Sequence, residues 1–129
     1  MFIDTGYVIA LINQTDQYHQ RALQLAEQYD GIPAITTDAI LLEIGNALSK
    51  IARNEAAEII RYFQTAPEVT VVPLTSELLT AALNLYSQYQ DKTWGLVDCI
   101  SFVVMQERKV SVALAFDRHF IQAGFSLAG

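Results

Sequence analysis

The feature that most constrains the fold is a single carboxylate closing a short apolar run at the start of the chain. The sequence opens MFIDTG, so Asp4 follows two large apolar residues and stands two residues before Gly6. An ionised carboxylate is costly to bury within a sheet. In open sheets of parallel strands, polar side chains collect where the strands end and a crevice forms. We therefore expect a first strand with Asp4 at its exit.

Three further acids stand in comparable settings. Asp117 ends the apolar run 111–116, and Asp98 lies early in the apolar stretch 96–109. Glu43 lies beside an apolar stripe of a predicted helix that begins at Thr37 or Asp38 and runs to about Ile51. We predict that these four acids meet at one site.

Apolar runs with strand character alternate with stretches of helical periodicity along the chain. The predicted strands are 1–3, 32–36, 69–73 and 111–116, with one further short edge strand in 124–129. The predicted helices are 6–13, 17–29, 37–51, 54–65, 75–89 and 96–109, with a helical turn at 119–123. Asp16 is expected to cap the helix 17–29. The helix 37–51 is expected to bury a stripe formed by Ile40, Ile44, Ala47, Leu48 and Ile51. This alternation predicts one α/β domain over residues 1–129 with a mainly parallel sheet.

Composition excludes several classes of protein. Hydrophobic residues make up 52% of the chain, which excludes a disordered segment. No apolar run is long enough to span a membrane, and the N-terminus lacks the basic region of a signal peptide. A lone cysteine, Cys99, is expected in the core and fits a reducing cytoplasm. The net charge of −6 is unusual for a nucleic-acid binder, but it falls to −2 when four acids are assigned to a metal site.

Each acid also has an alternative, purely structural role. Asp98 would then only stabilise the start of its helix, although a cap normally precedes the apolar segment. Asp4 and Asp117 would be turn residues or helix caps. Glu43 would be a solvated residue beside the apolar stripe of its helix, paired with Lys50.

Convergence of the four acids favours a metal over these separate roles. Clustered carboxylates raise one another's pKa unless a cation joins them. Oxygen ligands suit Mg²⁺ or Mn²⁺, and one or two such ions can stabilise the attacking and leaving oxygens of a phosphodiester.

Four other residues are candidate substrate contacts. Arg118 can clamp phosphate or pair with a surface acid. Lys92 and Trp94 precede the Asp98 helix, and a base can stack on Trp94 unless it is buried in the core. Ser101 lies one helical turn after Asp98. By contrast, His19 is expected to be solvated. His119, close to Asp117, is expected to be an exposed loop residue, and the alternative for it is a contact with phosphate.

Four segments resemble the PIN-domain family, in particular the VapC-type toxins of toxin–antitoxin modules. They are FIDTGYVIAL at the start, ILLEIGNAL around Glu43, DKTWGLVDCISF around Asp98 and AFDRHF around Asp117. They follow the family's order and separations over almost the whole chain. One departure is Gly95, where the family pattern has Ser or Thr, and Ser101 is the nearest replacement.

The resemblance implies a three-layer αβα sandwich in which Asp4, Glu43, Asp98 and Asp117 surround Mg²⁺ or Mn²⁺ and cleave RNA. It also implies a homodimer neutralised by an antitoxin whose tail reaches the site. The main alternative is a catalytically silent PIN-fold module that binds RNA or protein. A haloacid-dehalogenase-like phosphatase needs a second acid where Gly6 stands, and a receiver domain needs adjacent acids near Asp4.

Overall fold

The computed structural model describes residues 1–129 as five strands and seven helices. The strands are β1 (Phe2–Ile3), β2 (Ala34–Thr37), β3 (Val69–Val72), β4 (Val112–Leu114) and β5 (Ser126–Leu127). The helices are α1 (Thr5–Ile12), α2 (His19–Gln28), α3 (Asp38–Ala47), α4 (Arg53–Thr65), α5 (Ser76–Gln88), α6 (Leu96–Arg108) and α7 (His119–Gln122). The predicted alternation of strands and helices is confirmed.

All five strands form one parallel sheet in the order β3-β2-β1-β4-β5. The chain winds outward from β1 to β2 and β3, then returns across the sheet to place β4 on the other side of β1. The order therefore reverses between β1 and β4, which is where ligands bind in sheets of this kind. Asp4 directly follows β1, and Asp117 stands three residues after Leu114, the last residue of β4.

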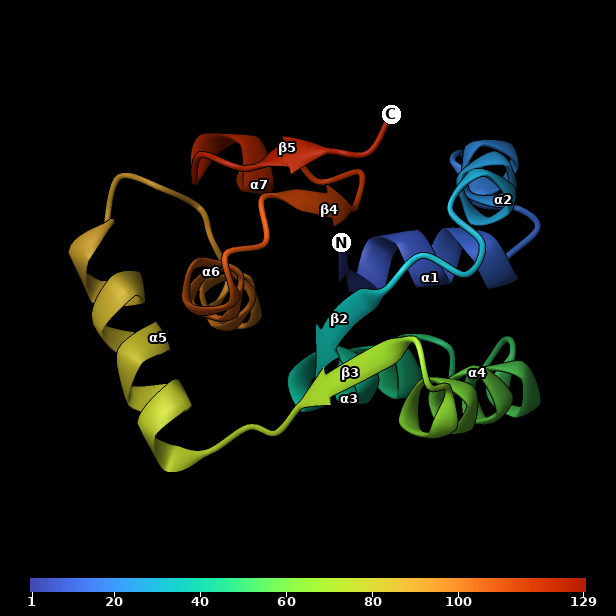
Figure 1. The fold of residues 1–129 in the computed structure, drawn as a ribbon, viewed down its shortest axis with the longest axis horizontal. Coiled ribbons are helices and arrows are strands. Elements are labelled where there is room, and N and C mark those ends of the chain that lie inside the picture. The colour runs from blue at the N-terminus through green and yellow to red at the C-terminus, as the bar shows by residue number, and fades with distance from the viewer.

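Helices cover both faces of the sheet and make a three-layer αβα arrangement. Figure 1 shows α5 and α6 on one side of the sheet and α1, α2 and α4 on the other. Helix α3 packs against α1 and α4, and α7 packs against α6. The helix α6, predicted to be central, buries six residues, Cys99 among them.

Aromatic rings join the elements that carry Asp98 and Asp117. Phe102 of α6 lies edge-on to Trp94 and to Phe120 of α7, with ring centroids 5.1 and 5.2 Å apart. Phe120 also contacts Phe2 of β1, at 6.2 Å. These rings fix the positions of α6 and α7 relative to the central strand, since aromatic contacts of this kind add to the stability of burial.

Two predicted helices have limits that differ by more than one residue from those in the structure. The helix predicted over 17–29 begins at His19, because the Asp16 side chain accepts the backbone N–H of Tyr18 at 2.8 Å and holds a turn there. The helix predicted to reach Ile51 ends at Ala47, since the chain turns back toward α4.

The predicted stripe of the third helix was wrong at two positions. Ala47 is exposed and Ile51 is 63% exposed, so neither belongs to the core. Leu41 is buried instead, together with Ile40, Ile44 and Leu48.

None of the seven helices has both the length and the hydrophobicity needed to cross a bilayer.

Candidate metal centre

Asp4 is a buried carboxylate at the exit of β1. Its side chain is enclosed, with the residue 8% exposed, and its backbone N–H donates to the Leu114 carbonyl of β4 at 3.1 Å. Burial raises its pKa to about 7, and the negative charges of Asp98 and, to a smaller extent, Glu43 act in the same direction. The backbone N–H groups of Thr5 and Gly6 lower it in part. The chain therefore holds an acid where its ionised form is poorly compensated.

Glu43 reaches the same region from α3. The Thr5 hydroxyl donates to Glu43 Oε1 at 2.5 Å, which links this helix to the residue next to Asp4. Glu43 is half-buried and makes no ion pair, so the alternative pairing with Lys50 is absent from the structure.

Asp98 is oriented by two donors at the start of α6. Its Oδ2 accepts the backbone N–H of Gly95 and lies 3.0 Å from His119 Nδ1. Gly95 stands at the helix N-cap, and a Cβ added there would lie 3.8 Å from Asp98 Oδ2, an ordinary contact. Ser101 does not replace a cap hydroxyl, because it is fully buried and donates to the Val97 carbonyl.

His119 brings Asp98 and Asp117 together. Its Nδ1 lies 3.0 Å from Asp98 Oδ2 and 3.2 Å from Asp117 Oδ2, and its backbone N–H donates to Asp117 Oδ1 at 2.9 Å. Its Nε2 lies 3.1 Å from the Thr93 hydroxyl. The expectation of an exposed loop residue was wrong, because α7 folds back against α6 and turns the imidazole inward.

The four acids thus form two overlapping groups that share Asp98. The first group is Asp4 with Asp98 and Glu43, whose negative charges both raise the pKa of Asp4. The second is Asp98, Asp117 and His119, each of which offers one ligand atom within 4.8 Å of the others. Asp4 and Asp117 do not contact each other through a hydrogen bond, but they follow the two paired strands β1 and β4.

The chemistry of these donors fits a hard divalent cation. Carboxylate oxygens dominate the set, which suits Mg²⁺ or Mn²⁺. A cation among them would offset the mutual repulsion that raises the pKa of Asp4. The Gly95 N–H orients Asp98, as groups outside the ligand set commonly do at metal sites, and His119 Nδ1 contacts Asp98 while being itself a candidate ligand atom.

Two of the candidate substrate contacts remain accessible. Arg118 is exposed and makes no ion pair. Lys92 pairs with Asp91 at 3.2 Å, and both lie in the loop before α6.

Trp94 and Ser101 are poorly placed for direct contact with a substrate. Trp94 is 7% exposed, and its indole N–H donates to Gln122 at 3.0 Å. Of the two roles expected for Trp94, burial in the core fits the structure better than base stacking does. Ser101 is fully buried.

The expectation that His19 is solvated was wrong, because its side chain is half-buried and its Nδ1 lies 2.7 Å from the Ala10 carbonyl oxygen.

Neither the contact of Thr5 with Glu43 nor that of His119 with Asp98 was predicted from the sequence. Both Thr5 and His119 stand within two residues of a predicted acid, at Asp4 and Asp117. That proximity was the available signal.

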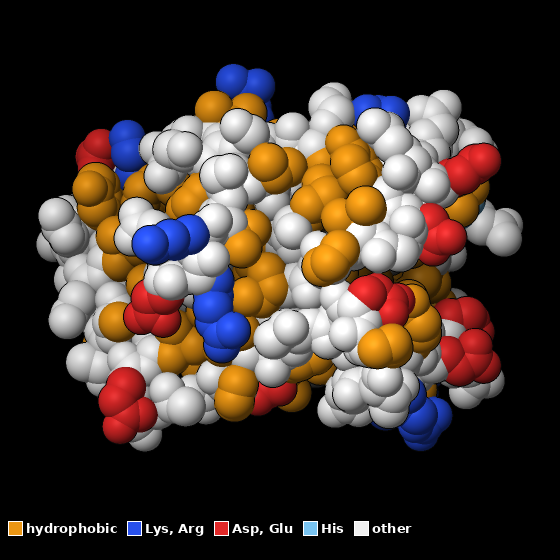
Figure 2. All heavy atoms as spheres, viewed as in Figure 1, with side chains coloured by type: hydrophobic (Ala, Val, Ile, Leu, Met, Phe, Trp, Pro, Cys, Tyr) orange, Lys and Arg blue, Asp and Glu red, His pale blue; other side chains and the backbone are white.

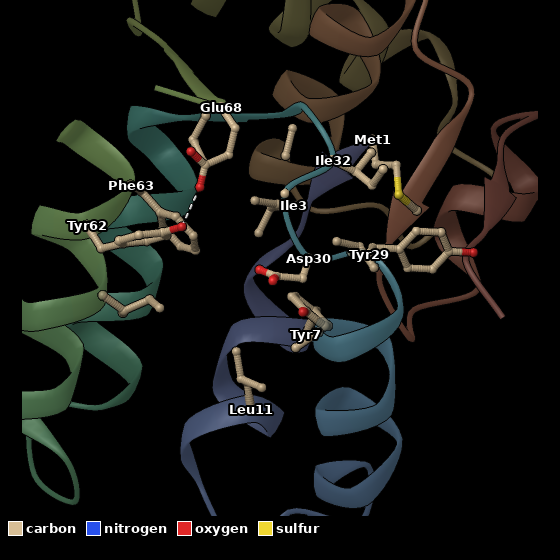
Figure 3. A pocket seen from close by; sticks show the side chains of 16 residues that line it. Met1, Ile3, Tyr7, Leu11, Tyr29, Asp30, Ile32, Tyr62, Phe63 and Glu68 are labelled. Carbon is tan, nitrogen blue, oxygen red and sulfur yellow. Dashed lines mark hydrogen bonds between the residues drawn. The ribbon is translucent and has the colours of Figure 1, made fainter. Parts of the chain in front are cut away.

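An apolar pocket of about 170 Å³ lies apart from the acids, between α1, α2, α4 and the beginnings of the central strands. Figure 3 shows Tyr7 and Leu11 of α1 together with Tyr62 and Phe63 of α4 around it. The Tyr62 hydroxyl donates to Glu68 at its rim. None of the four predicted acids lines this pocket, so it is separate from the carboxylate centre.

Comparison with known proteins identifies the class that this fold and site define. The PIN-domain model matches residues 1–126, and the chain belongs to the PIN-domain family. A curated relative is the 23S rRNA-specific endonuclease VapC20 of Mycobacterium tuberculosis, recorded in two strains. It is 28% identical over 125 residues, which cover 97% of this chain and 95% of the relative.

A crystal structure of M. tuberculosis VapC20, described as a sarcin–ricin loop cleaving toxin, has the same fold. Its TM-score is 0.87 at 27% sequence identity, and the match covers 96% of this chain and 95% of that one. The predicted three-layer fold and the family resemblance are thereby confirmed.

Proposed function

We propose that this chain, a single domain over residues 1–129, is a divalent-metal-dependent endoribonuclease that acts as the toxin of a toxin–antitoxin pair in the cytoplasm. Two observations support the proposal: Asp98, Asp117 and His119 form a group of candidate metal ligands, and Asp98 and Glu43 lie close enough to the buried Asp4 for their charges to act on it. The charges of Asp98 and Glu43 help to raise the pKa of Asp4, and His119 joins Asp98 to Asp117. Membership of the PIN-domain family supports the same chemistry.

Ribosomal RNA is the first substrate to test. The relative VapC20 is a 23S rRNA-specific endonuclease, and its solved structure is described as cleaving the sarcin–ricin loop. We propose a structured ribosomal RNA loop, presented with its bases unpaired, as the substrate class of this chain.

In this proposal the protein's own residues hold the cation, orient the acids that bind it and contact the substrate phosphate. Asp4, Glu43, Asp98 and Asp117 hold the cation, and Thr5 and His119 fix the positions of three of these acids. Arg118 is free to donate to a phosphate oxygen. When bound, Mg²⁺ or Mn²⁺ supplies activation of water and neutralises charge developing at the phosphodiester.

The proposed partners are RNA, an antitoxin and a second copy of the chain. VapC-type toxins are the relatives on which the antitoxin proposal rests. An antitoxin segment that reaches the carboxylates would compete with RNA for them.

Cleavage of an RNA containing the sarcin–ricin sequence tests the proposal. The wild-type protein is expected to cut it with Mg²⁺ or Mn²⁺ and to stop when EDTA is added. Asp98→Asn is expected to lower the rate by more than about 100-fold, since it weakens a ligand shared by both groups of acids.

Asp30→Asn is the matched control, because it removes the same charge from an exposed residue outside the centre. Its rate should equal that of the wild type. RNA binding without cleavage under any metal would support the silent-module alternative and refute the nuclease.

A further inference from the structure

A second concave region adjoins the carboxylate centre at the connection between α5 and α6. It is a hollow of about 350 Å³ lined by Tyr86, Tyr89, Gln90, Lys92, Thr93 and Trp94, here called the tyrosine hollow. Figure 1 shows this connection passing beside α7, which carries His119. The four acids do not line it.

The tyrosine hollow carries aromatic surface that the fold leaves uncovered. Tyr86 is 48% exposed and stacks on no other ring of the protein. Tyr89 is 38% exposed and leans on Trp94, with ring centroids 5.1 Å apart. Trp94 is itself fixed by its hydrogen bond to Gln122 and its edge contact with Phe102. The hollow therefore presents two exposed rings for stacking, of which Tyr89 is held by Trp94 and Tyr86 is uncovered.

Charge and polarity distinguish the tyrosine hollow from an apolar docking groove. Lys92 supplies a cation that pairs in the free protein only with the exposed Asp91. Gln90 adds an exposed amide that can both donate and accept hydrogen bonds. Aromatic faces beside a cation are the combination that binds single-stranded nucleic acid.

Side-chain contacts connect the tyrosine hollow to the carboxylates. The Thr93 hydroxyl lies at the edge of the hollow and 3.1 Å from His119 Nε2. The other nitrogen of that ring lies 3.0 Å from Asp98 Oδ2. One imidazole thus separates the hollow from the acids, so a nucleotide in the hollow would be adjacent to a phosphate at the centre.

We propose that the tyrosine hollow is a subsite for an unpaired RNA base next to the scissile phosphate. The base stacks on Tyr86, with Tyr89 and Gln90 beside it, and Lys92 contacts the backbone. The inference rests on the proposed nuclease function and adds the element that selects unpaired substrate.

Two measurements on Tyr86→Ala test the subsite. The first is the affinity for a short, unstructured, fluorescein-labelled RNA, measured by anisotropy with Ca²⁺ in place of Mg²⁺. Loss of the ring should weaken binding about tenfold. The second is steady-state cleavage of the same RNA with Mg²⁺, in which KM should rise about tenfold while kcat stays within about twofold.

Three variants serve as comparisons. Tyr86→Phe keeps the ring and should bind as the wild type does. Tyr62→Ala removes a ring of similar exposure, 50%, from α4 on the other side of the sheet and should change nothing. Lys92→Gln should reduce the salt dependence of binding by about one phosphate contact.

The results separate the subsite from the nuclease. Weaker binding by Tyr86→Ala, in a protein that cleaves no RNA, supports the subsite and refutes the nuclease. Unchanged affinity and KM in Tyr86→Ala overturn the subsite, as does a wild type that binds no RNA. A changed molecular mass with unchanged RNA affinity also overturns it and assigns this face to a protein interface.

Discussion

Asp4 has the most unusual electrostatic environment of the four acids. It is buried, and burial together with Asp98 and Glu43 raises its pKa from 3.8 to about 7. Between these values the metal-free folded protein keeps a proton that the unfolded chain has lost. Its stability therefore falls as the pH rises from about 4 to about 7, and the loss is complete above 7.

Asp4→Asn removes this titration from the folded state. In EDTA above pH 7, the variant should be more stable than the wild type, by at most about 4 kcal/mol, the energy that corresponds to the raised pKa. Near pH 4 the two proteins should have similar stability. Urea unfolding across this pH range measures the difference. A wild type whose stability does not fall toward neutral pH would show that Asp4 is ionised without penalty.

His119 shows what residue-level reading of a sequence misses. Asp4, Asp98 and Asp117 were predictable because each acid interrupts or closes an apolar run. The same logic does not apply to His119, which follows Asp117 and Arg118 in a polar stretch. Its position depends on α7 folding back so that the ring meets Asp98, twenty-one residues earlier in the sequence. Only the tertiary structure supplies that contact.

At the scale of elements, the hydrogen bond from Thr5 to Glu43 joins the first turn of α1 to the middle of α3. We expect it to hold Glu43 toward Asp4, so that Thr5 acts as a positioning residue. Thr5→Val keeps the shape and removes the donor. Affinity for Mn²⁺, measured by calorimetry, should fall about 10-fold.

Thr5→Ser restores the donor and should return the Mn²⁺ affinity to near the wild-type value. If Val and Ser variants bind Mn²⁺ equally well, the hydroxyl has no role in orienting Glu43. Thermal unfolding of both variants controls for a general loss of structure.

The elements themselves were largely predictable, and their ends were not. Four strands and the succession of helices follow from alternating apolar patterns and caps such as Thr37 and Thr75, whose hydroxyls accept Ile40 and Leu78 N–H. Hydrophobic periodicity indicates which face of a helix is buried, but not the residue at which the helix ends. The stripe in α3 continued in sequence to Ile51, while the chain had already left the helix to meet α4.

At the scale of the molecule, the reversal of strand order between β1 and β4 assembles the site from segments far apart in the chain. Large hydrophobic side chains remain outside, among them Leu79 and Leu83 of α5, at 40% and 49% exposed. Figure 2 shows hydrophobic side chains distributed between charged ones over one face. Exposed apolar surface of this kind is common at protein interfaces.

We expect the chain to form a homodimer through such a surface. Light scattering at micromolar concentration should give twice the 14.4 kDa mass of the chain. The monomer mass at that concentration would contradict the dimer without affecting the assignment of the acids.

Crystals grown with Mn²⁺ would decide whether the carboxylates form a metal centre. We predict an anomalous difference peak at the carboxyl ends of β1 and β4, within coordination distance of Asp4 and Asp98 carboxylate oxygens. No Mn²⁺ peak at these carboxylates, with any bound Mn²⁺ confined to other surface acids, would contradict the metal centre and the nuclease proposed from it.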